Sequence, residues 1–136
     1  MSDEQQVTTG EGYAVSTLDD LGDGYGFRKI RGPLGVTAFG VNALVVPSGY
    51  GGPNHYHDEQ EELYFVHKGR ARFEFGDGAQ HELGPGGVVW ADAPCMRRFH
   101  SIGDEDLVLF VVGGKGGYVG RDGRSGEPDG EKVRTD

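Results

Sequence analysis

Basic residues are scarce in this chain, and their scarcity excludes a class of partner. Lysine and arginine total 13 against 22 aspartate and glutamate residues among 136, so the formal net charge is −9. Binding to nucleic acid draws on clustered positive charge, and an anionic membrane surface attracts the same kind of patch. We therefore expect neither nucleic acid nor a membrane as a partner.

Cysteine and long apolar runs are also nearly absent. The single cysteine, Cys95, rules out an intrachain disulfide and a multi-thiolate zinc site. No run approaches the roughly 20 apolar residues needed to span a bilayer, and the acidic start "MSDEQQ" does not resemble a signal peptide. We therefore expect a cytoplasmic protein in which histidine and carboxylate side chains hold any metal ion.

Glycine, in contrast, is abundant, with 26 residues against 6 prolines. The glycines separate short runs of Val, Phe, Leu and Tyr, which is typical of tight turns between short strands. Six such strand candidates follow one another over residues 62–68, 70–75, 79–83, 88–92, 95–101 and 107–112. The pattern predicts an all-β fold, an antiparallel sandwich or barrel.

The length favours one domain with a terminal extension on each side. Residues 1–24 are acidic and Gly-rich and predict a flexible N-terminal arm. Residues 25–120 contain the strand candidates and form the predicted barrel. Residues 121–136 have mixed charge and few apolar side chains, which predicts a mobile C-terminal tail.

One short stretch, "HYHDEQEELYFVHKG" (residues 55–69), carries metal-binding chemistry. In an extended segment residues i and i+2 point the same way, so His55 and His57 present their imidazoles to one point. Asp58, Glu59, Glu61 and Glu62 each offer the carboxylate that would complete the set. An isolated His-x-His is most often an exposed polar turn, but this pair precedes a strand candidate and has acids close by, which favours a metal site.

Two histidines and one carboxylate on one face leave coordination positions open. This arrangement is associated with non-heme Fe(II), and Mn, Ni, Co, Cu and Zn also suit such ligands. The open positions would hold water, oxygen or a chelating substrate. We therefore expect a divalent transition metal as the cofactor.

These residues resemble the first motif of the cupin superfamily, which reads Gly, five residues, His-x-His, three or four residues, Glu, six residues, Gly. The chain has Gly49, "YGGPN", His55-Tyr56-His57, "DEQE", Glu62, "LYFVHK" and Gly69, so every fixed position is filled. The resemblance selects Glu62 as the carboxylate, with His55 and His57. It covers residues 35–113 and implies a small single-domain cupin, which is an antiparallel β-barrel or jelly roll, as a homodimer.

The second cupin motif is eroded, and Arg97 stands where the last metal-binding histidine is expected. Aligned from Gly86, the motif's other fixed positions hold Asp92, Pro94 and Ser101. An arginine has no lone pair for a metal. Three interpretations remain: Arg97 binds an anionic substrate beside a three-ligand metal, Arg97 pairs with Glu62 in a metal-free barrel, or His100 replaces it as a ligand, which strand parity disfavours.

Tyr64 shares the face of Glu62 because alternation along the strand places both on one side. We therefore predict Tyr64 and Arg97 as substrate-binding residues. The function predicted is a metal-binding cupin, dioxygenase-like or isomerase-like, that acts on a small anionic substrate. The alternative is a non-catalytic cupin that binds a small molecule, metal-free with Arg97 paired to Glu62, and the sequence does not decide between enzyme and binding protein.

Overall fold

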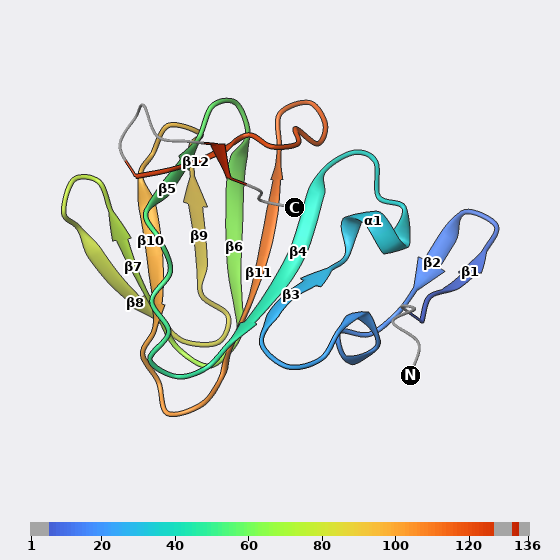
Figure 1. The fold of residues 1–136 in the computed structure, drawn as a ribbon, viewed down its shortest axis with the longest axis horizontal. Helices are drawn as coiled ribbons and strands as arrows, with labels where there is room; N and C mark the ends of the chain where they lie inside the picture. The colour runs from blue at the N-terminus through green and yellow to red at the C-terminus, as the bar shows by residue number, and fades with distance from the viewer. Residues whose placement is uncertain (1–5, 127–131, 134–136) are drawn as a thin grey trace.

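The computed structural model describes residues 6–126 and 132–133, almost all of them in strands and tight turns (Figure 1). Two short helical segments are present, the 3-10 helix η1 (Asp19–Leu21) and α1 (Arg31–Leu34). The strands are β1 (Thr8–Gly10), β2 (Tyr13–Val15), β3 (Gly26–Lys29), β4 (Gly40–Val46), β5 (His55–His57), β6 (Glu61–Lys68), β7 (Ala71–Phe75), β8 (Gln80–Leu83), β9 (Val88–Ala91), β10 (Arg97–Ser101), β11 (Leu107–Gly114), β12 (Gly123–Ser125) and β13 (Lys132–Val133).

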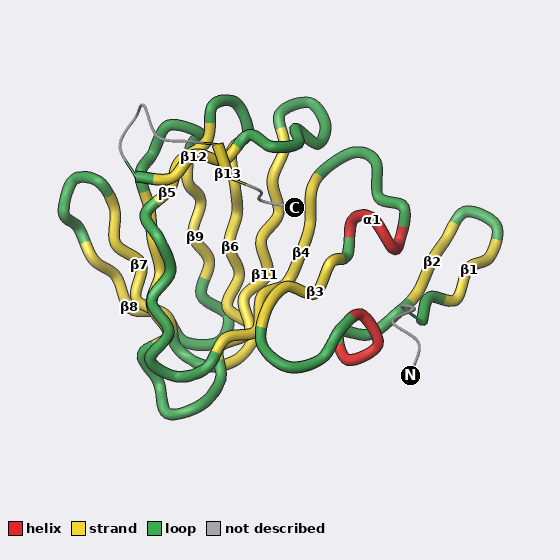
Figure 2. The backbone as a smooth tube through the Cα atoms, in the orientation of Figure 1, coloured by secondary structure: helices red, strands yellow, loops and turns green. Residues whose placement is uncertain are grey.

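Two antiparallel sheets face each other, as Figures 1 and 2 show. One has six strands in the order β13-β12-β5-β10-β7-β8, and the other has five in the order β3-β4-β11-β6-β9. The all-β prediction is confirmed, and each of the six strand candidates corresponds to a strand from β6 to β11. No helix in the described part of the chain is long and apolar enough to cross a membrane.

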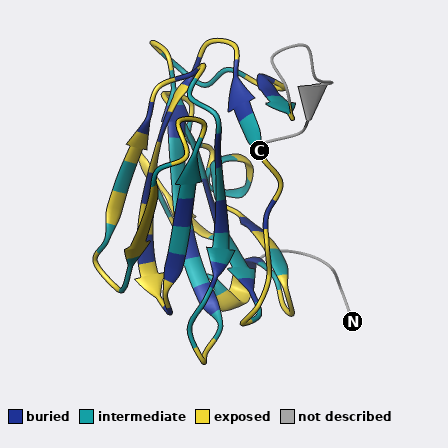
Figure 3. Cartoon of the chain, turned by 90° about the vertical axis from the view of Figure 1, so that its left-hand side faces the viewer, coloured by how far each residue is buried: buried dark blue, intermediate teal, exposed yellow. Residues whose placement is uncertain are grey.

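Alternation along each strand separates the interior from the surface, because successive side chains point to opposite faces of a sheet. In β6 the side chains of Glu62, Tyr64 and Val66 are buried while those of Leu63 and Phe65 are exposed. Figure 3 shows this as alternating buried and exposed bands along the strands. The same parity that packs the core therefore turns Glu62 and Tyr64 inward.

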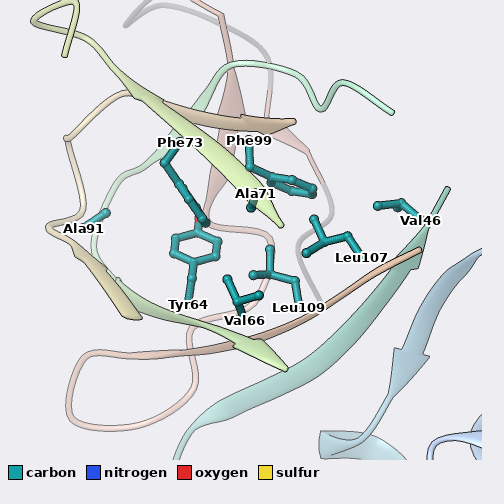
Figure 4. Close-up of a cluster of buried hydrophobic side chains, with 9 residues drawn as sticks. All are labelled: Val46, Tyr64, Val66, Ala71, Phe73, Ala91, Phe99, Leu107 and Leu109. Atoms are coloured by element: carbon teal, nitrogen blue, oxygen red, sulfur yellow. The ribbon is translucent and has the colours of Figure 1, made fainter. Parts of the chain in front are cut away.

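The core lies between the two sheets at the middle of the barrel. Its buried side chains come from both sheets, and Figure 4 shows them facing one another around the rings of Tyr64 and Phe73. Fully burying one such Val, Leu or Phe side chain stabilises the fold by about 1.5–3 kcal/mol. The cluster comprises Val46, Tyr64, Val66, Ala71, Phe73, Ala91, Phe99, Leu107 and Leu109.

The turn after β6 requires glycine at the last position of the first motif. Gly69 has a φ of 83°, and a Cβ there would lie 2.5 Å from the carbonyl oxygen of Asp106. A side chain would be strained on both counts. Gly69 therefore belongs to the motif because of the turn and plays no part in metal binding.

Short strands are present within both of the predicted terminal extensions. Residues 8–15 form the β1–β2 hairpin, which Figure 1 places beside α1 and apart from the two large sheets. Gly123–Ser125 pairs with β5, so the sheet extends past the predicted boundary at residue 120. A three-residue strand of this kind is stabilised by backbone pairing, which composition does not reveal. Residues 1–5, 127–131 and 134–136 of the predicted arm and tail lie outside the described residues.

Candidate metal centre

His55 and His57 lie on β5, a three-residue strand held between β10 and β12. His55 pairs with Arg97 of β10 and with Ser125 of β12, and His57 pairs with Gly123. Because the histidines are two residues apart, both rings point into the barrel, with ring centroids 5.6 Å apart. The His57 side chain is completely buried, and that of His55 is 19% exposed.

Glu62 reaches the histidines from the opposite sheet. Its Oε1 atom lies 3.2 Å from Nε2 of His57 and 3.7 Å from Nε2 of His55. The three candidate ligand atoms all lie within 4.8 Å of one another. The geometry therefore brings together the two histidines and the carboxylate that the first motif selects.

The other three acids of the stretch lie elsewhere. The Asp58 carboxylate accepts a hydrogen bond of 2.6 Å from Nε of Arg124, and Glu61 accepts one of 2.6 Å from the Trp90 indole on the outer face. Glu59 is exposed. The spacing left four acids as candidates for the carboxylate ligand. Of these four, only Glu62 is turned into the barrel by the pairing of the strands.

Nε2 of His57 is a buried atom with no hydrogen-bond partner among the described residues. On the other side of the ring, Nδ1 lies 3.5 Å from the Asp122 carboxylate and 3.4 Å from Nε2 of Gln60. A carboxylate facing Nδ1 favours the tautomer with a proton there, which leaves a lone pair on Nε2. A lone pair 3.2 Å from the ionised Glu62 is unfavourable unless a cation lies between them.

The spacing of the ligand atoms also suits a metal ion. Atoms about 2.1 Å from one ion are roughly 3.0 Å apart in octahedral and 3.4 Å apart in tetrahedral coordination. The separations of 3.2 and 3.7 Å from Glu62 to the two histidines lie near these values. The side chains present therefore fit a divalent transition metal.

Asp122 is a functional residue that sequence reasoning missed. It is 1% exposed and accepts hydrogen bonds from the backbone amides of Glu59 at 2.9 Å and of Gln60 at 2.8 Å. These bonds fix the loop between the two histidines and Glu62 while the same carboxylate faces His57. In the sequence it was one more acid in a Gly-rich segment assigned to the tail.

Arg97 is 1% exposed, and the described residues around it occupy its guanidinium. Nη2 lies 2.9 Å from Glu62 Oε1, and Nε donates to the Tyr64 hydroxyl at 3.2 Å. Nη1 is directed at backbone carbonyls, those of Cys95 at 2.6 Å and Ala93 at 3.2 Å. Arg97 therefore holds Glu62 and Tyr64 in position from behind, the pairing expected in the second interpretation.

His100 lies outside this group. Its Nε2 is 2.5 Å from the Glu74 carboxylate, and its register partner on β7 is Arg72. Residues 97 and 100 have opposite parity along β10, so their side chains leave opposite faces of the sheet. The third interpretation, with His100 as a ligand, is wrong for this arrangement.

The ionisation of Glu62 and Tyr64 follows from their surroundings. Burial acts to raise the pKa of Glu62, but the close approach of the His55 and His57 imidazoles and the charge of Arg97 outweigh it and hold that pKa well below its usual range. Burial, followed by the Glu62 charge, raises the pKa of Tyr64. Tyr64 therefore stays neutral, and its hydroxyl donates to Glu62 Oε1 at 2.7 Å.

Burial acts to lower the pKa of Arg97, but Tyr64 and Glu62 outweigh it and raise that pKa above its ordinary value. The charge of Arg97 is therefore fixed at any working pH. The site consists of a fixed cation, a fixed anion and a neutral phenol beside two imidazoles.

A cavity of about 250 Å³ opens onto this group. His55, Gln60, Glu62 and Tyr64 line it, whereas Arg97 and His57 are not among the described residues that do. Its remaining lining comes from both sheets and from segments beside them. Those residues are Phe27, Arg31, Gly40, Val41, Asn42, Leu44, Tyr50, Pro53, Phe99, Val111, Gly113, Tyr118 and Ser125.

Comparison with known proteins identifies relatives of this fold. The family model described as "Cupin domain" matches residues 43–113, and no curated protein matches the chain. A cupin protein (BF4112) from Bacteroides fragilis is 21% identical with a TM-score of 0.61, over 85% of this chain and 86% of that one. A protein with a double-stranded β-helix domain from Klebsiella pneumoniae is 19% identical with a TM-score of 0.59, over 66% of this chain and 76% of that one.

A third similar structure comes from work on the DMSP lyases RdDddP and RnDddQII. It is 26% identical with a TM-score of 0.56, over 65% of this chain and 44% of that chain. This chain therefore spans less than half the length of that relative. At the identities of the other two structures, the likeness concerns the fold alone.

Proposed function

The chain belongs to the cupin family, and we propose that it is a metal-dependent enzyme, dioxygenase-like or isomerase-like, acting on a small anionic substrate in the barrel cavity. His55, His57 and Glu62 would hold a divalent transition metal. The observation that carries the proposal is the convergence of their three ligand atoms, including the buried and partnerless Nε2 of His57, beside a cavity of about 250 Å³.

The bound metal would supply a Lewis acid that polarises an oxygen atom of the substrate. The chain's own residues do the rest. Asp122 orients His57 through Nδ1, and Arg97 keeps Glu62 ionised and aimed at the histidines. Tyr64, which lines the cavity and keeps its proton, donates that proton in a hydrogen bond to Glu62 Oε1 and so helps to hold the carboxylate in place.

Likeness to a chain from the DMSP lyase structures supports an enzyme over a storage protein. The cavity also suits a small molecule, because its walls are largely apolar and a small number of polar groups line it. Water is excluded from the buried side of the ligand group, where His57 and Arg97 are covered completely.

Metal titration tests the proposal directly. The metal-free protein, prepared with a chelator, is titrated with Co²⁺ while its visible absorption is followed. We expect one equivalent to bind, and we expect His57→Ala to abolish binding. His81→Ala is the matched control, because His81 is exposed on β8, away from the cavity. Failure of the wild-type protein to bind one equivalent of Co²⁺, Fe²⁺, Mn²⁺ or Zn²⁺ would sink the proposal.

Turnover is tested separately from metal binding. Protein loaded anaerobically with Fe²⁺ is mixed with a panel of small organic acids, and oxygen uptake and product formation are measured beside the His57→Ala variant. Turnover that this variant lacks supports the enzyme.

A second candidate function is a metal-free binding module, and the Arg97–Glu62 pair favours it. The Glu62 oxygen that would bind the metal already accepts hydrogen bonds from Arg97 and Tyr64. In that case the buried ion pair replaces the metal and the cavity only binds its ligand. Tight ligand binding by chelator-treated protein, without turnover of the panel after metal loading, would favour the module.

A further inference from the structure

The cavity contains a cationic residue that the sequence did not single out. Among the described lining residues Arg31, in α1, is the only basic one. The first interpretation of the sequence assigned anion binding to Arg97, but Arg97 lies behind Glu62 and points at backbone carbonyls. A substrate anion inside this cavity would therefore contact Arg31, which lines it, and not Arg97, which does not.

Two glycines connect Arg31's end of the cavity with the metal centre. Gly40 of β4 pairs with Gly113 of β11, which in turn pairs with Glu62 of β6. Both glycines line the cavity. Since neighbouring strands are about 4.8 Å apart, Gly40 lies about 10 Å from Glu62, and the Tyr118 ring packs against Gly40 while the Glu62 side chain packs against Gly113.

Tyr118 lies beside Gly40. A Cβ on Gly40 would lie 2.8 Å from Cδ1 of Tyr118, so the glycine is what allows the ring to lie against β4. The guanidinium carbon of Arg31 is 3.9 Å from the centre of the same ring. Such a contact fixes an arginine in place, and the planar fork of donors on a guanidinium matches the geometry of a carboxylate.

A second, smaller cavity reinforces the positive charge at this end. Its volume is about 120 Å³, and it shares Arg31 and Asn42 with the main cavity and adds Lys29. In a chain of net charge −9, two neighbouring cations mark a local site of anion attraction. The walls of the main cavity also include Leu44, Phe99 and Val111, which suit an apolar body.

We propose that Arg31, held over Tyr118, is the anion-binding residue of the cavity and that the ligand is a small organic carboxylate with an apolar body. Its carboxylate contacts Arg31, and its other end points along the cavity toward His55 and Glu62. This inference rests on the proposed function and names the substrate class for the same cavity. It assigns the binding of the substrate anion to Arg31, whereas the sequence predicted Arg97 for this role.

Calorimetric titration with defined probes tests it. The probes are benzoate and 3-phenylpropionate, the uncharged analogue benzamide, and inorganic phosphate. Hydrogen bonds to a charged group are worth about 1.5–3 kcal/mol, so we expect the carboxylates to bind roughly 10- to 100-fold more tightly than benzamide. Arg31→Gln should remove this preference and Arg31→Lys should keep part of it.

Lys68→Gln is the matched control, because it removes the same charge from an exposed position on β6. It should bind the carboxylates like the wild-type protein. Gly40→Ala provides a second variant, since the added Cβ displaces Tyr118 without touching a metal ligand. It should weaken carboxylate binding and leave Co²⁺ binding unchanged.

Several results would overturn the inference. They are equal carboxylate affinity in Arg31→Gln and the wild-type protein, no carboxylate binding to the wild-type protein at millimolar concentration, or stronger binding of phosphate than of both carboxylates. Co²⁺ titration of the same samples separates this inference from the metal centre. Arg31-dependent binding without Co²⁺ refutes the metal centre alone, and Co²⁺ binding without Arg31-dependent selectivity refutes this inference alone.

Discussion

Replacing Arg97 with methionine should destabilise the protein strongly, because it leaves the Glu62 carboxylate buried without its cation. The two side chains are 1% and 5% exposed and approach to 2.9 Å. Unit charges about 4 Å apart attract by about 4 kcal/mol at an effective dielectric constant near 20. Removing one partner of a buried pair costs about 3–5 kcal/mol, and we expect Arg97→Met to lower the free energy of unfolding by that amount.

A double-mutant cycle isolates the pair from the packing of each side chain. We expect Arg97→Met combined with Glu62→Gln to cost about 2–3 kcal/mol less than the sum of the single variants. Urea unfolding followed by circular dichroism, in the presence of a chelator, measures all four free energies. The partly exposed pair Arg72 and Glu74, 3.5 Å apart and 25–33% exposed, serves as the control, and its coupling should stay below about 1 kcal/mol.

Additivity within about 0.5 kcal/mol for Arg97 and Glu62 would refute this reasoning. The same Arg97→Met protein also discriminates between the two candidate functions. If the histidines and Glu62 bind a metal, removing the neighbouring positive charge should strengthen Co²⁺ binding, because like charges repel. If the pair replaces the metal, neither protein should bind Co²⁺.

Three further predictions concern neighbouring features. Asp122→Asn, which keeps an oxygen for the backbone amides, should weaken metal binding about 10- to 100-fold in a Co²⁺ titration, because it removes the carboxylate facing His57. The pKa of Tyr64 is raised above its ordinary value of 10.0 in the folded protein. The contribution of Tyr64 to stability is therefore present below about pH 10 and is lost as the pH rises further. The free energy of unfolding, measured from pH 8 to 11, should fall less steeply in Tyr64→Phe than in the wild-type protein. Trp90 is 60% exposed on the edge strand β9, and we expect a second copy of the chain to cover that outer face. Trp90→Ser should then convert a dimer to a monomer in light scattering. A monomeric wild-type protein would contradict this prediction.

Local spacing determined much of the candidate metal centre. His55 and His57 share a face because they are two residues apart in a strand, and Glu62 turns inward with Tyr64 for the same reason. Gly69 follows from the backbone conformation of the next turn. Such patterns are readable because strand periodicity and turn geometry act over a few residues.

Residues contributed by distant segments were not readable. Asp122 is 65 positions from His57 and lies in a glycine-rich segment whose composition indicated a tail. It reaches the histidine because β12 pairs with β5, a pairing made by backbone groups that carry no side-chain signal. Arg31 and Tyr118 likewise come from distant segments, and their contact depends on Gly40 of β4, which leaves room for the Tyr118 ring.

The sequence by itself determined the all-β class, the shared face of Glu62 and Tyr64, and a complete first motif at His55, His57 and Glu62. It also determined that Arg97 cannot bind a metal, since a guanidinium has no lone pair. The tertiary structure decided what Arg97 does instead, because the approach of the two sheets sets its distance to Glu62. Parity along a strand fixes which way a side chain points, but register and barrel closure fix what it meets.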